Sequence, residues 1–572
     1  MTSIRAQRSI RRSSVAPLDA QLGFSGGDIA AQARDLWAFI RARFSFNPLS
    51  WGAAALVFVG AFLLDMRQLG SASLWFDETY SIGISHQPVA YLLKFMLNND
   101  PNMALYYLLL HVWQTELAKF GVTQTEVIAR TPSVFFGALG SVAIFALGRR
   151  FGGWTTGVVA AALYSFSNYA LLAAQQARSY AMVMCWIIIA GYMLFGALNE
   201  SERRWTRWWW SGYTLAMTLA LYAQLLTVFV IAAHMLGVVA LLVIPGPWRA
   251  NARQNLRQAL IGLMAIIILI LPLIYGATHS GGSDWVQPAT PKDAYNVLLD
   301  QLSDGSSLFL IIQCVVIGCG VGLALYAWLN PEIFSHIERL KHSEVASWRV
   351  WRLREPRPGI TLLLLWTVFP FVVMYAITQL YLNLHFFFSR YEMLMMPDVA
   401  LLLGLSVSLL PWPPLQWLLS AMLVTMAVVN LPYYYKHAQI QDFRTPITWL
   451  EARYQPGDGI ICYPNDLCSI PVQAELNAYP SPARFDADSP GAYSWSDLYS
   501  LPVTIKTVSA YAARHPTGMF YVDAHLGGTN ANSPTIDAAI LAWLGARYTL
   551  RDKIVTSNVT VYYYTSGPPG GQ

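Results

Sequence analysis

The stretch "ARTPSVFFGALGSVAIFALGRRFGG" (residues 129–153) contains an apolar run over 132–148 and then two arginines, Arg149 and Arg150. A helix of about 20 residues crosses a hydrocarbon layer of about 30 Å, so the run is long enough to span a membrane. Arginines gather at the cytoplasmic ends of such spans. The stretch therefore predicts a transmembrane helix whose C-terminal end lies on the cytoplasmic side.

The composition of the whole chain agrees with this prediction. Of the 572 residues 55% are hydrophobic and 12% are charged, whereas soluble domains carry about 25% charged residues. The net charge is +5, and the basic residues form clusters between apolar runs instead of one continuous stripe. These properties indicate a polytopic membrane protein and exclude a single-span, peripheral or nucleic-acid-binding protein.

Apolar runs of similar length recur along the chain and predict about eleven transmembrane helices. They lie near 49–65, 132–148, 154–171, 179–197, 211–225, 227–244, 258–275, 306–329, 360–380, 391–410 and 415–432. With this count the arginine-rich connections fall on the same side as the arginine-rich N-terminus. We therefore expect a cytoplasmic N-terminus and an extracytoplasmic C-terminus.

One further segment, "MALYYLLLHVWQTELAKFG" (103–121), is apolar enough to be a span. Counting it alone would move Arg149 and Arg150 to the outer side. We interpret it as a re-entrant or juxtamembrane segment that stays on the outer face. A true span, compensated by a crossing missed elsewhere, is the alternative.

The chain divides into three parts. Residues 1–47 form a basic, partly disordered cytoplasmic tail, and 48–432 form the transmembrane domain with a first outer loop over 66–131. Residues 433–572 contain short β-rich runs separated by turn residues, such as "PGDGIICYP", "TGMFYVDAH" and "NVTVYYYT". This pattern predicts an extracytoplasmic α/β domain. The expected fold is thus an α-helical polytopic membrane protein with a C-terminal α/β domain.

Two cysteines, Cys462 and Cys468, flank "YPNDL" in the predicted outer domain. Disulfides persist in oxidising compartments outside the cytoplasm. We predict a bridge between them, with two buried free thiols as the alternative.

Polar residues collect at the predicted outer ends of the helices. Asp77 and Glu78 follow the first span directly, Arg178 opens the fourth, and "HFFFSRY" (385–391) precedes the tenth. Arginines bind phosphate and an aspartate can take a proton from a hydroxyl group, so this set suits a phosphate-bearing substrate and an acceptor alcohol. The alternatives are interfacial anchoring for the arginines and an aromatic belt for Trp75 and Phe76.

Several motifs occur in a characteristic order: "WFDE", "DPNMALYYLLLHVW", the 129–153 stretch, "YSFSNYALLAAQQARSYAM", "FFFSRYEMLMMP" and "DFRTPITWLEARYQPGDGIICYP". Over most of residues 49–465 this order resembles the GT-C glycosyltransferases, in particular the bacterial branch related to protein O-mannosyltransferases and the lipid A aminoarabinose transferase. The resemblance implies an inverting enzyme of the bacterial inner membrane. Such an enzyme would move a sugar from a polyprenyl phosphate to a hydroxyl group of an envelope glycan, glycolipid or protein on the extracytoplasmic face.

The resemblance also implies roles for individual residues. Asp77 would be the general base, and its neighbour Glu78 would orient Asp77 or the acceptor, or bind a divalent cation. Arg390 and Tyr391 match an arginine–tyrosine pair that contacts the donor phosphate. Arg178 and His385 would contact the same phosphate.

The chain departs from the family where relatives often carry basic residues. Asp100 stands in "DPN" in place of a basic phosphate contact, and Gln224 replaces a histidine common near the end of the fifth span. We expect Asp100, Gln224 and Asp284 to contact the acceptor or a cation, and metal dependence stays open.

Two other classes of function remain as alternatives, a flippase for lipid-linked sugars and a non-catalytic envelope assembly subunit. Transporters usually hold ionisable residues near mid-membrane, whereas the charges here concentrate at helix ends. The enzyme is therefore the preferred interpretation.

Overall fold

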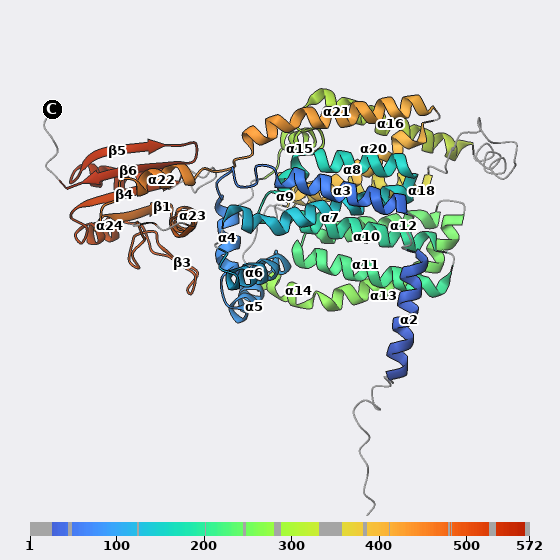
Figure 1. Cartoon of the computed structure of the whole chain (residues 1–572), viewed down its shortest axis with the longest axis horizontal. Coiled ribbons are helices and arrows are strands. Elements are labelled where there is room, and N and C mark those ends of the chain that lie inside the picture. Colours follow the sequence, from blue (N-terminus) through green and yellow to red (C-terminus); the bar gives the residue numbers. More distant parts are fainter. Residues whose placement is uncertain are drawn as a thin grey trace, which may run out of the picture.

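A computed structural model describes most of the chain. The described residues are 26–43, 48–122, 125–200, 202–243, 247–279, 288–330, 357–380, 386–410, 412–478, 481, 483–524 and 533–566. They form a helical bundle with a smaller unit, built on a β-sheet, at one end of the bundle (Figure 1).

The N-terminal half of the chain is helical throughout its described part. Its helices are α2 (Gly26–Arg43), α3 (Pro48–Met66), α4 (Phe76–Ser85), α5 (Val89–Asn98), α6 (Ala104–Lys119), α7 (Glu126–Gly152), α8 (Trp154–Phe166), α9 (Asn168–Ala174), α10 (Tyr180–Asn199), α11 (Arg203–Ala223), α12 (Thr227–Val243), α13 (Pro247–Leu269) and α14 (Leu271–His279). The helices that follow before the sheet are α15 (Pro291–Ser303), α16 (Ser307–Leu329), α18 (Arg357–Leu380), α19 (Ser389–Glu392), the 3-10 turn η1 (Met393–Met395), α20 (Met396–Leu409), α21 (Pro413–His437) and α22 (Arg444–Glu451).

Ten of the eleven predicted spans fall on a helix or a helix pair, and the span near 391–410 falls on α19, η1 and α20. Seven helical segments in the described part of the chain are long and apolar enough to cross a membrane, namely α3, α7, α10, α16, α18, α21 and the segment from Arg390 to Leu409. Two bent pairs, α8 with α9 and α13 with α14, raise that number to nine. The helices α11 and α12, which cover two further predicted spans, are not among these segments. The chain is thus a multi-pass membrane protein, and the count of eleven stays a prediction.

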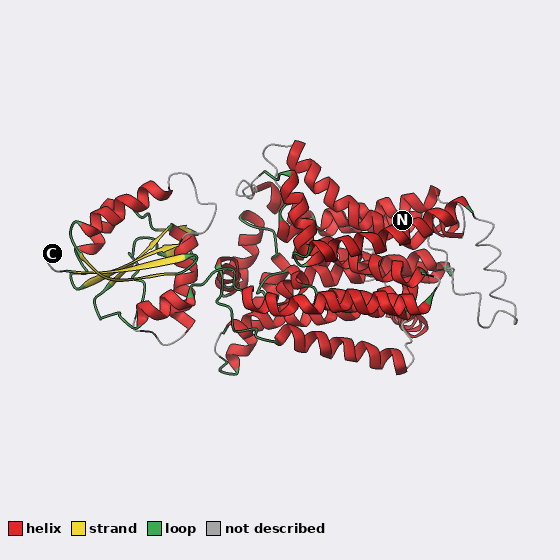
Figure 2. Cartoon of the chain, turned by 90° about the horizontal axis from the view of Figure 1, so that it is seen from above, coloured by secondary structure: helices red, strands yellow, loops and turns green. Residues whose placement is uncertain are grey.

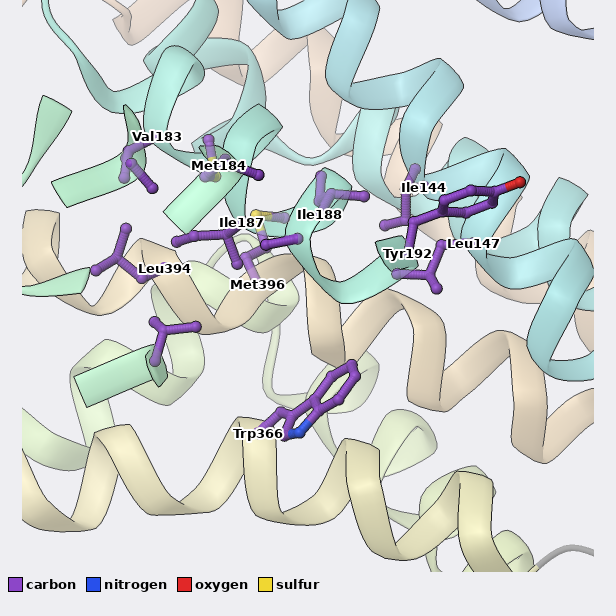
Figure 3. Packing of buried hydrophobic residues seen from close by; sticks show 14 of the residues in the cluster. Ile144, Leu147, Val183, Met184, Ile187, Ile188, Tyr192, Trp366, Leu394 and Met396 are labelled. Carbon is purple, nitrogen blue, oxygen red and sulfur yellow. The ribbon is translucent and has the colours of Figure 1, made fainter. Parts of the chain in front are cut away.

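The centre of the bundle is formed by helices that are apolar on all sides. Of the most apolar 18-residue stretch of α10, 83% is buried inside the protein, whereas 17% of the corresponding stretch of α3 is buried. Its side chains pack against those of α7, η1, α20 and α18 (Figure 3). Close approach of α7 and α8 depends on Gly148 and Gly157, since a β-carbon on Gly148 would lie 2.9 Å from the Cα atom of Gly157. Small residues allow membrane helices to pack this tightly.

The predicted first outer loop forms the short helices α4, α5 and α6 at the bundle end that faces the sheet unit (Figure 1). The helix α6 has 16 residues and is not among the helices long enough to span. Met103, which precedes it, has a φ of 64°.

The C-terminal unit contains a four-stranded sheet in the order β1-β4-β6-β5. Its strands are β1 (Gly459–Tyr463), β4 (Gly518–Ala524), β5 (Thr549–Val555) and β6 (Val559–Thr565), and a separate hairpin pairs β2 (Tyr493–Ser494) with β3 (Tyr499–Ser500). The strands β1 and β4 are parallel, whereas β6 runs antiparallel to both β4 and β5. The three β-rich runs noted in the sequence form β1, β4 and β6.

Helices cover both faces of this sheet (Figure 2). Ile460 and Cys462 of β1 pack with α22 and α23 (Asn465–Ala478), whereas Ile461 and Tyr463 pack with α24 (Ile505–Ala512) and α25 (Ser533–Gly545). Successive side chains of a strand point to opposite faces. A strand buried on both faces therefore reads as a continuous apolar run, as "GIICY" does.

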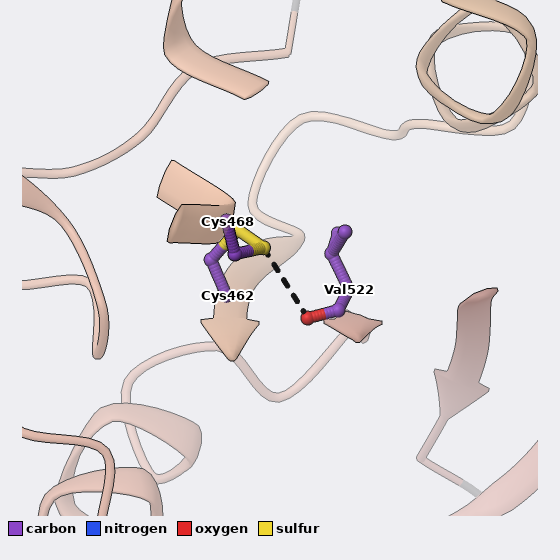
Figure 4. The surroundings of a disulfide bond; sticks show 3 residues. All are labelled: Cys462, Cys468 and Val522. Atoms are coloured by element: carbon purple, nitrogen blue, oxygen red, sulfur yellow. Dashed lines mark hydrogen bonds between the residues drawn. A yellow bond between two sulfur atoms is a disulfide. The ribbon is translucent and has the colours of Figure 1, made fainter. Parts of the chain in front are cut away.

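The predicted disulfide is present. Cys462 at the end of β1 is bonded to Cys468 in α23. The sulfur atom of Cys468 lies 3.5 Å from the carbonyl oxygen of Val522 in β4 (Figure 4). The bridge therefore ties α23 to β1, the edge strand that pairs with β4.

Candidate active site

The helix α4 carries both carboxylates of the "WFDE" motif in its first turn. The backbone N–H of Trp75 donates to Oε2 of Glu78 at 3.4 Å, so Glu78 satisfies a donor that the helix leaves free. Acidic residues in this position also interact favourably with the positive end of the helix dipole. The sequence thus fixes where α4 begins and presents Asp77 beside Glu78.

Glu78 is completely buried and bound to Arg130 of α7. The guanidinium group donates to both carboxylate oxygens, at 2.8 and 2.7 Å. Arg130 also donates to the carbonyl oxygens of Leu69, Ala72 and Ser73. This bidentate pair joins α4 and the preceding loop to a membrane-spanning helix.

Glu78 makes a further contact that sets the position of Arg178. Its Oε1 atom accepts a hydrogen bond from the backbone N–H of Ala177 at 2.8 Å. The neighbouring Arg178 donates to the carbonyl oxygen of Asp77 at 3.3 Å and to the hydroxyl of Ser81 at 3.1 Å. The buried carboxylate therefore holds the turn before α10 against α4.

Asp77 points away from this buried pair and lies between two arginines. Its Oδ2 atom is 3.0 Å from Arg390 and 3.8 Å from Arg178. The Asp77 side chain is 24% exposed, and those of Arg390 and Arg178 are 27% and 13% exposed. The guanidinium group of Arg390 also lies over the ring of Trp75, 4.2 Å from its centre. The predicted base and two predicted phosphate contacts thus meet at one accessible point.

Asp100 lies in the loop between α5 and α6, and Gln224 directly follows α11. Asp100 accepts a hydrogen bond from the backbone N–H of Asn102, whose side chain in turn accepts one from the N–H of Leu225. Burial raises the pKa of Asp100 to about 6, although the positive charge of Arg178 opposes that shift. The loop before α6 is therefore docked on the end of α11 and lies within electrostatic reach of the arginines.

Several buried polar atoms around this point have no hydrogen-bond partner among the described residues. They are Nε of Arg178, Oε1 of Gln224 and Nε1 of Trp75. Buried polar groups are paired in the great majority of cases, so these atoms are free to bind a polar ligand or water.

Of the three remaining predicted site residues, Tyr391 lies in the described part of the chain. Tyr391 follows Arg390 in the short helix α19. His385 and Asp284 lie outside the described residues.

A divalent cation at Asp77 and Glu78 does not fit the donor set. Both carboxylates are bound by guanidinium groups, and no three His, Cys, Asp or Glu side chains gather in the described part of the chain.

Sequence reasoning missed Arg130. A signal was available, because an arginine at the start of an apolar run needs a counter-charge, and Glu78 was the acid without an assigned partner. It also missed the stacking of Arg390 on Trp75, which depends on a contact between residues more than 300 positions apart.

Comparisons with known proteins concern the fold of the chain and the family of one segment. Residues 109–275 match the family model "Dolichyl-phosphate-mannose-protein mannosyltransferase". The sequence matches no curated protein.

Two solved structures share the fold. ArnT from Cupriavidus metallidurans in the apo state has a TM-score of 0.54 at 12% identity, over 92% of this chain and 100% of ArnT. The same protein bound to undecaprenyl phosphate has a TM-score of 0.50 at 13% identity, over 91% of this chain and 99% of ArnT.

The chain thus has the fold of these ArnT structures, and residues 109–275 match the mannosyltransferase family model.

Proposed function

We propose that the protein transfers a sugar from a polyprenyl phosphate donor to an acceptor hydroxyl group, with inversion at the anomeric carbon. The observation that carries this proposal is the carboxylate of Asp77 between Arg390 and Arg178, at 3.0 and 3.8 Å. It is supported by the fold shared with ArnT, which has been solved with undecaprenyl phosphate bound.

In this proposal the donor phosphate engages the two arginines. A phosphate oxyanion offers them charge-assisted hydrogen bonds and competes with Asp77 for the same guanidinium groups. The stacking of Arg390 on Trp75 keeps that guanidinium group in place while its partner changes. Phosphate binding thereby releases the Asp77 carboxylate towards the acceptor.

The transfer then takes one concerted step. Asp77 removes the proton of the acceptor hydroxyl, whose oxygen forms a bond to the anomeric carbon on the face opposite the phosphate. The bond between that carbon and the phosphate oxygen breaks, and polyprenyl phosphate leaves with its charge stabilised by Arg390 and Arg178. General-base catalysis of this kind contributes about 10²- to 10⁴-fold.

Glu78 takes the role of a positioning residue. Both of its oxygens are bound by Arg130, and it also holds the N–H of Ala177. It keeps the first turn of α4 and the turn of Arg178 in register and does not contact the substrate.

We further propose that the end of the bundle carrying Asp77 and the sheet unit is extracytoplasmic, in a bacterial inner membrane. The Cys462–Cys468 bridge supports this side, because disulfides persist outside the cytoplasm. The acceptor is an envelope glycan, a glycolipid or a protein.

The experiment that tests the function compares envelope glycans, glycolipids and glycoproteins by mass spectrometry in a deletion strain and in complemented strains. Wild-type protein should restore one glycosylated product, and Asp77→Asn should not. A matched control is Asp552→Asn, because Asp552 also lies 3.0 Å from an arginine, Arg453, but in the sheet unit. Full restoration by Asp77→Asn at wild-type expression would rule out Asp77 as the base.

A further inference from the structure

A second set of polar groups lies at the other end of the bundle. The helix α7 runs from Arg130, next to Glu78, to Arg150 near its C-terminus. Twenty residues of α-helix extend about 30 Å, which is the thickness of the hydrocarbon core. Arg150 therefore lies at the opposite membrane face from Asp77.

Arg150 lines a hollow of about 360 Å³ at this end. The hollow is bordered by Arg43, Arg150, Asn199, Glu200, Phe195 and Trp209. It thus contains groups from α2, from the ends of α7 and α10, and from α11.

Two arginines and one carboxylate line this hollow. Arg43 donates to both oxygens of Glu200 at 2.8 and 2.9 Å, and Glu200 also accepts from the indole N–H of Trp209. Arg43 also donates to Glu202 at 3.1 Å, and Glu202 pairs in turn with Arg204. Arg150, by contrast, pairs with no carboxylate among the described residues. Its guanidinium group lies 4.1 Å from the ring centre of Tyr192 and 4.5 Å from that of Trp209.

The backbone makes room for this guanidinium group. A β-carbon on Gly196 would lie 2.7 Å from a terminal nitrogen of Arg150. The cation is thus held between aromatic rings at the wall of an open hollow. It donates one hydrogen bond to Tyr192, and its other N–H groups can meet an anion.

The helix α2 borders the same hollow and runs across the direction of the spanning helices, projecting beyond the bundle (Figure 1). It is attached through Phe39, whose ring lies 4.9 Å from that of Trp209. Its Leu36, Trp37 and Ile40 side chains are exposed. These three residues share one helix face, since they lie at positions i, i+1 and i+4.

Basic residues surround this apolar face. Arg34 and Arg41 are exposed on α2, and Arg203, Arg204 and Arg207 lie at the start of the adjacent α11. Of these, Arg204 pairs with Glu202 and Arg207 with Asp35 of α2, so the other three supply the excess positive charge. An amphipathic helix with exposed tryptophan and leucine and with flanking arginines lies in the plane of the membrane interface. Basic clusters next to a span attract anionic lipids by about 1 kcal/mol per residue.

We propose that α2 and the hollow of Arg150 together form a binding site for an anionic phospholipid at the membrane face opposite the candidate active site. The apolar face of α2 enters the acyl region, and the lipid phosphate takes the guanidinium group of Arg150. This proposal is independent of the transfer reaction.

The test uses the purified full-length protein in mixed micelles of phosphatidylglycerol and phosphatidylcholine, with retained lipid counted by native mass spectrometry. Wild-type protein should retain phosphatidylglycerol in preference to phosphatidylcholine. Arg150→Met should weaken that retention about fivefold, the factor that corresponds to about 1 kcal/mol. Arg150→Lys should recover part of it, because the charge remains without the planar fork.

The matched control is Arg67→Met. Arg67 also lies over an aromatic ring, 4.9 Å from the centre of Tyr435, but follows α3 at the end that carries Asp77. It should leave retention unchanged. Equal retention of the two lipids by wild-type protein, or an equal loss in both variants, would overturn the proposal.

Two further measurements separate the lipid from other anions. Inorganic phosphate at millimolar concentration should not displace the lipid, and displacement would instead assign the hollow to free anions. Hydrogen exchange of α2 should slow when phosphatidylglycerol is added, and Trp37→Ser with Ile40→Ser should abolish that change. Exchange that does not respond to lipid in the wild-type protein would refute membrane contact of α2.

Discussion

The indole ring of Trp495, in the hairpin between β2 and β3, occupies the space that a β-carbon on Gly83 would take. Gly83 belongs to α4, the helix that carries Asp77 in its first turn. The carbonyl oxygen of Trp495 also accepts a hydrogen bond from Tyr91 of α5. The sheet unit is therefore fitted against the helix that carries the candidate base.

Gly83→Ala should push the hairpin away from α4. Overpacking of this kind costs about 1–3 kcal/mol, so the contact should open while the bundle remains folded. Hydrogen exchange of residues 493–500 and of α4 should accelerate. Gly52→Ala in α3 is the control, because a β-carbon there meets no atom within 4 Å. If hydrogen exchange is unchanged in Gly83→Ala, the contact between Gly83 and Trp495 does not contribute to stability.

Arg390→Ala should weaken binding of undecaprenyl phosphate by about 10- to 100-fold. Hydrogen bonds to charged groups contribute about 1.5–3 kcal/mol each. Arg390→Lys should recover only part of the affinity, since a lysine lacks the planar fork. Binding to protein in nanodiscs, measured by calorimetry, checks both values.

Arg453→Ala is a matched control for this measurement. Arg453 makes the same two contacts as Arg390, an ion pair at 3.0 Å with Asp552 and stacking at 4.1 Å on Trp449, but within the sheet unit. Its replacement should leave lipid affinity unchanged. If Arg390→Ala and wild-type protein bind undecaprenyl phosphate with equal affinity, the phosphate binds at another site.

Glu78→Gln should act mainly by lowering the free energy of unfolding, and not by slowing the transfer step directly. Removing one partner of a buried ion pair costs about 3–5 kcal/mol, because the other charge remains buried and unpaired. Arg130→Met should cost a similar amount, and the double variant should cost less than the sum of the two. Thermal unfolding in detergent measures all three. A stable Glu78→Gln protein without transfer activity would instead make Glu78 a catalytic residue.

Stability should fall with rising pH because of Glu475 in α23. Burial raises its pKa to about 7, with Arg444 opposing the shift, and the Glu475 carboxylate accepts a hydrogen bond from Ser73. Between pH 4.5 and 7 the folded protein keeps a proton that the unfolded chain releases, so this group lowers stability as pH rises through that window. The effect is at most about 3 kcal/mol.

Glu475→Gln keeps the acceptor for Ser73 and removes the titration. The difference in Tm between pH 5 and pH 8 should therefore shrink in this variant. Glu116→Gln, which changes a glutamate exposed in α6, should leave the difference as in wild-type protein. An unaltered pH profile in Glu475→Gln would mean that Glu475 does not control this dependence.

The Cys462–Cys468 bridge predicts the number of reactive thiols. In unreduced, denatured protein only Cys185, Cys314 and Cys319 should be alkylated, and reduction should expose two more. The bridge closes a loop with a sequence separation of 6, which corresponds to about 2 kcal/mol in the chain-entropy model. Cys462→Ser with Cys468→Ser should lower stability by roughly that amount. Five reactive thiols without reductant would exclude the bridge and remove the support for an extracytoplasmic sheet unit.

The elements that the sequence predicted well are those with an uninterrupted apolar run. The spans of α3, α7, α10 and α16 and the buried strands β1 and β4 all have this property. In contrast, β5 reads "TLRDKIV" and is largely exposed, so neither alternation nor apolarity marks it as a strand. The helix α2 lies within a segment that the sequence predicts to be a partly disordered tail. The sequence does not show this helix, because it packs on the bundle through a contact between Phe39 and Trp209, which lie far apart in the chain.

The sequence also predicted the site only in part. It indicated the acid pair, which follows a span directly, but it did not indicate that the two carboxylates have different environments. Asp77 is partly exposed whereas Glu78 is buried, and that contrast arises from Arg130 and Ala177, which approach from other parts of the chain. Neighbours in sequence received different environments from tertiary contacts alone.

The Glu78–Arg130 pair also constrains how the molecule is made. The two residues lie 52 positions apart, and a chain under synthesis emerges from its N-terminus. Glu78 is therefore synthesised before its counter-charge, and the ion pair that holds the first turn of α4 can form only after α7 has been made. The contact between Ser73 and Glu475, 402 positions apart, closes later still. Asp77 pairs with Arg390, 313 positions further along the chain, so its final surroundings form only after that segment has been synthesised.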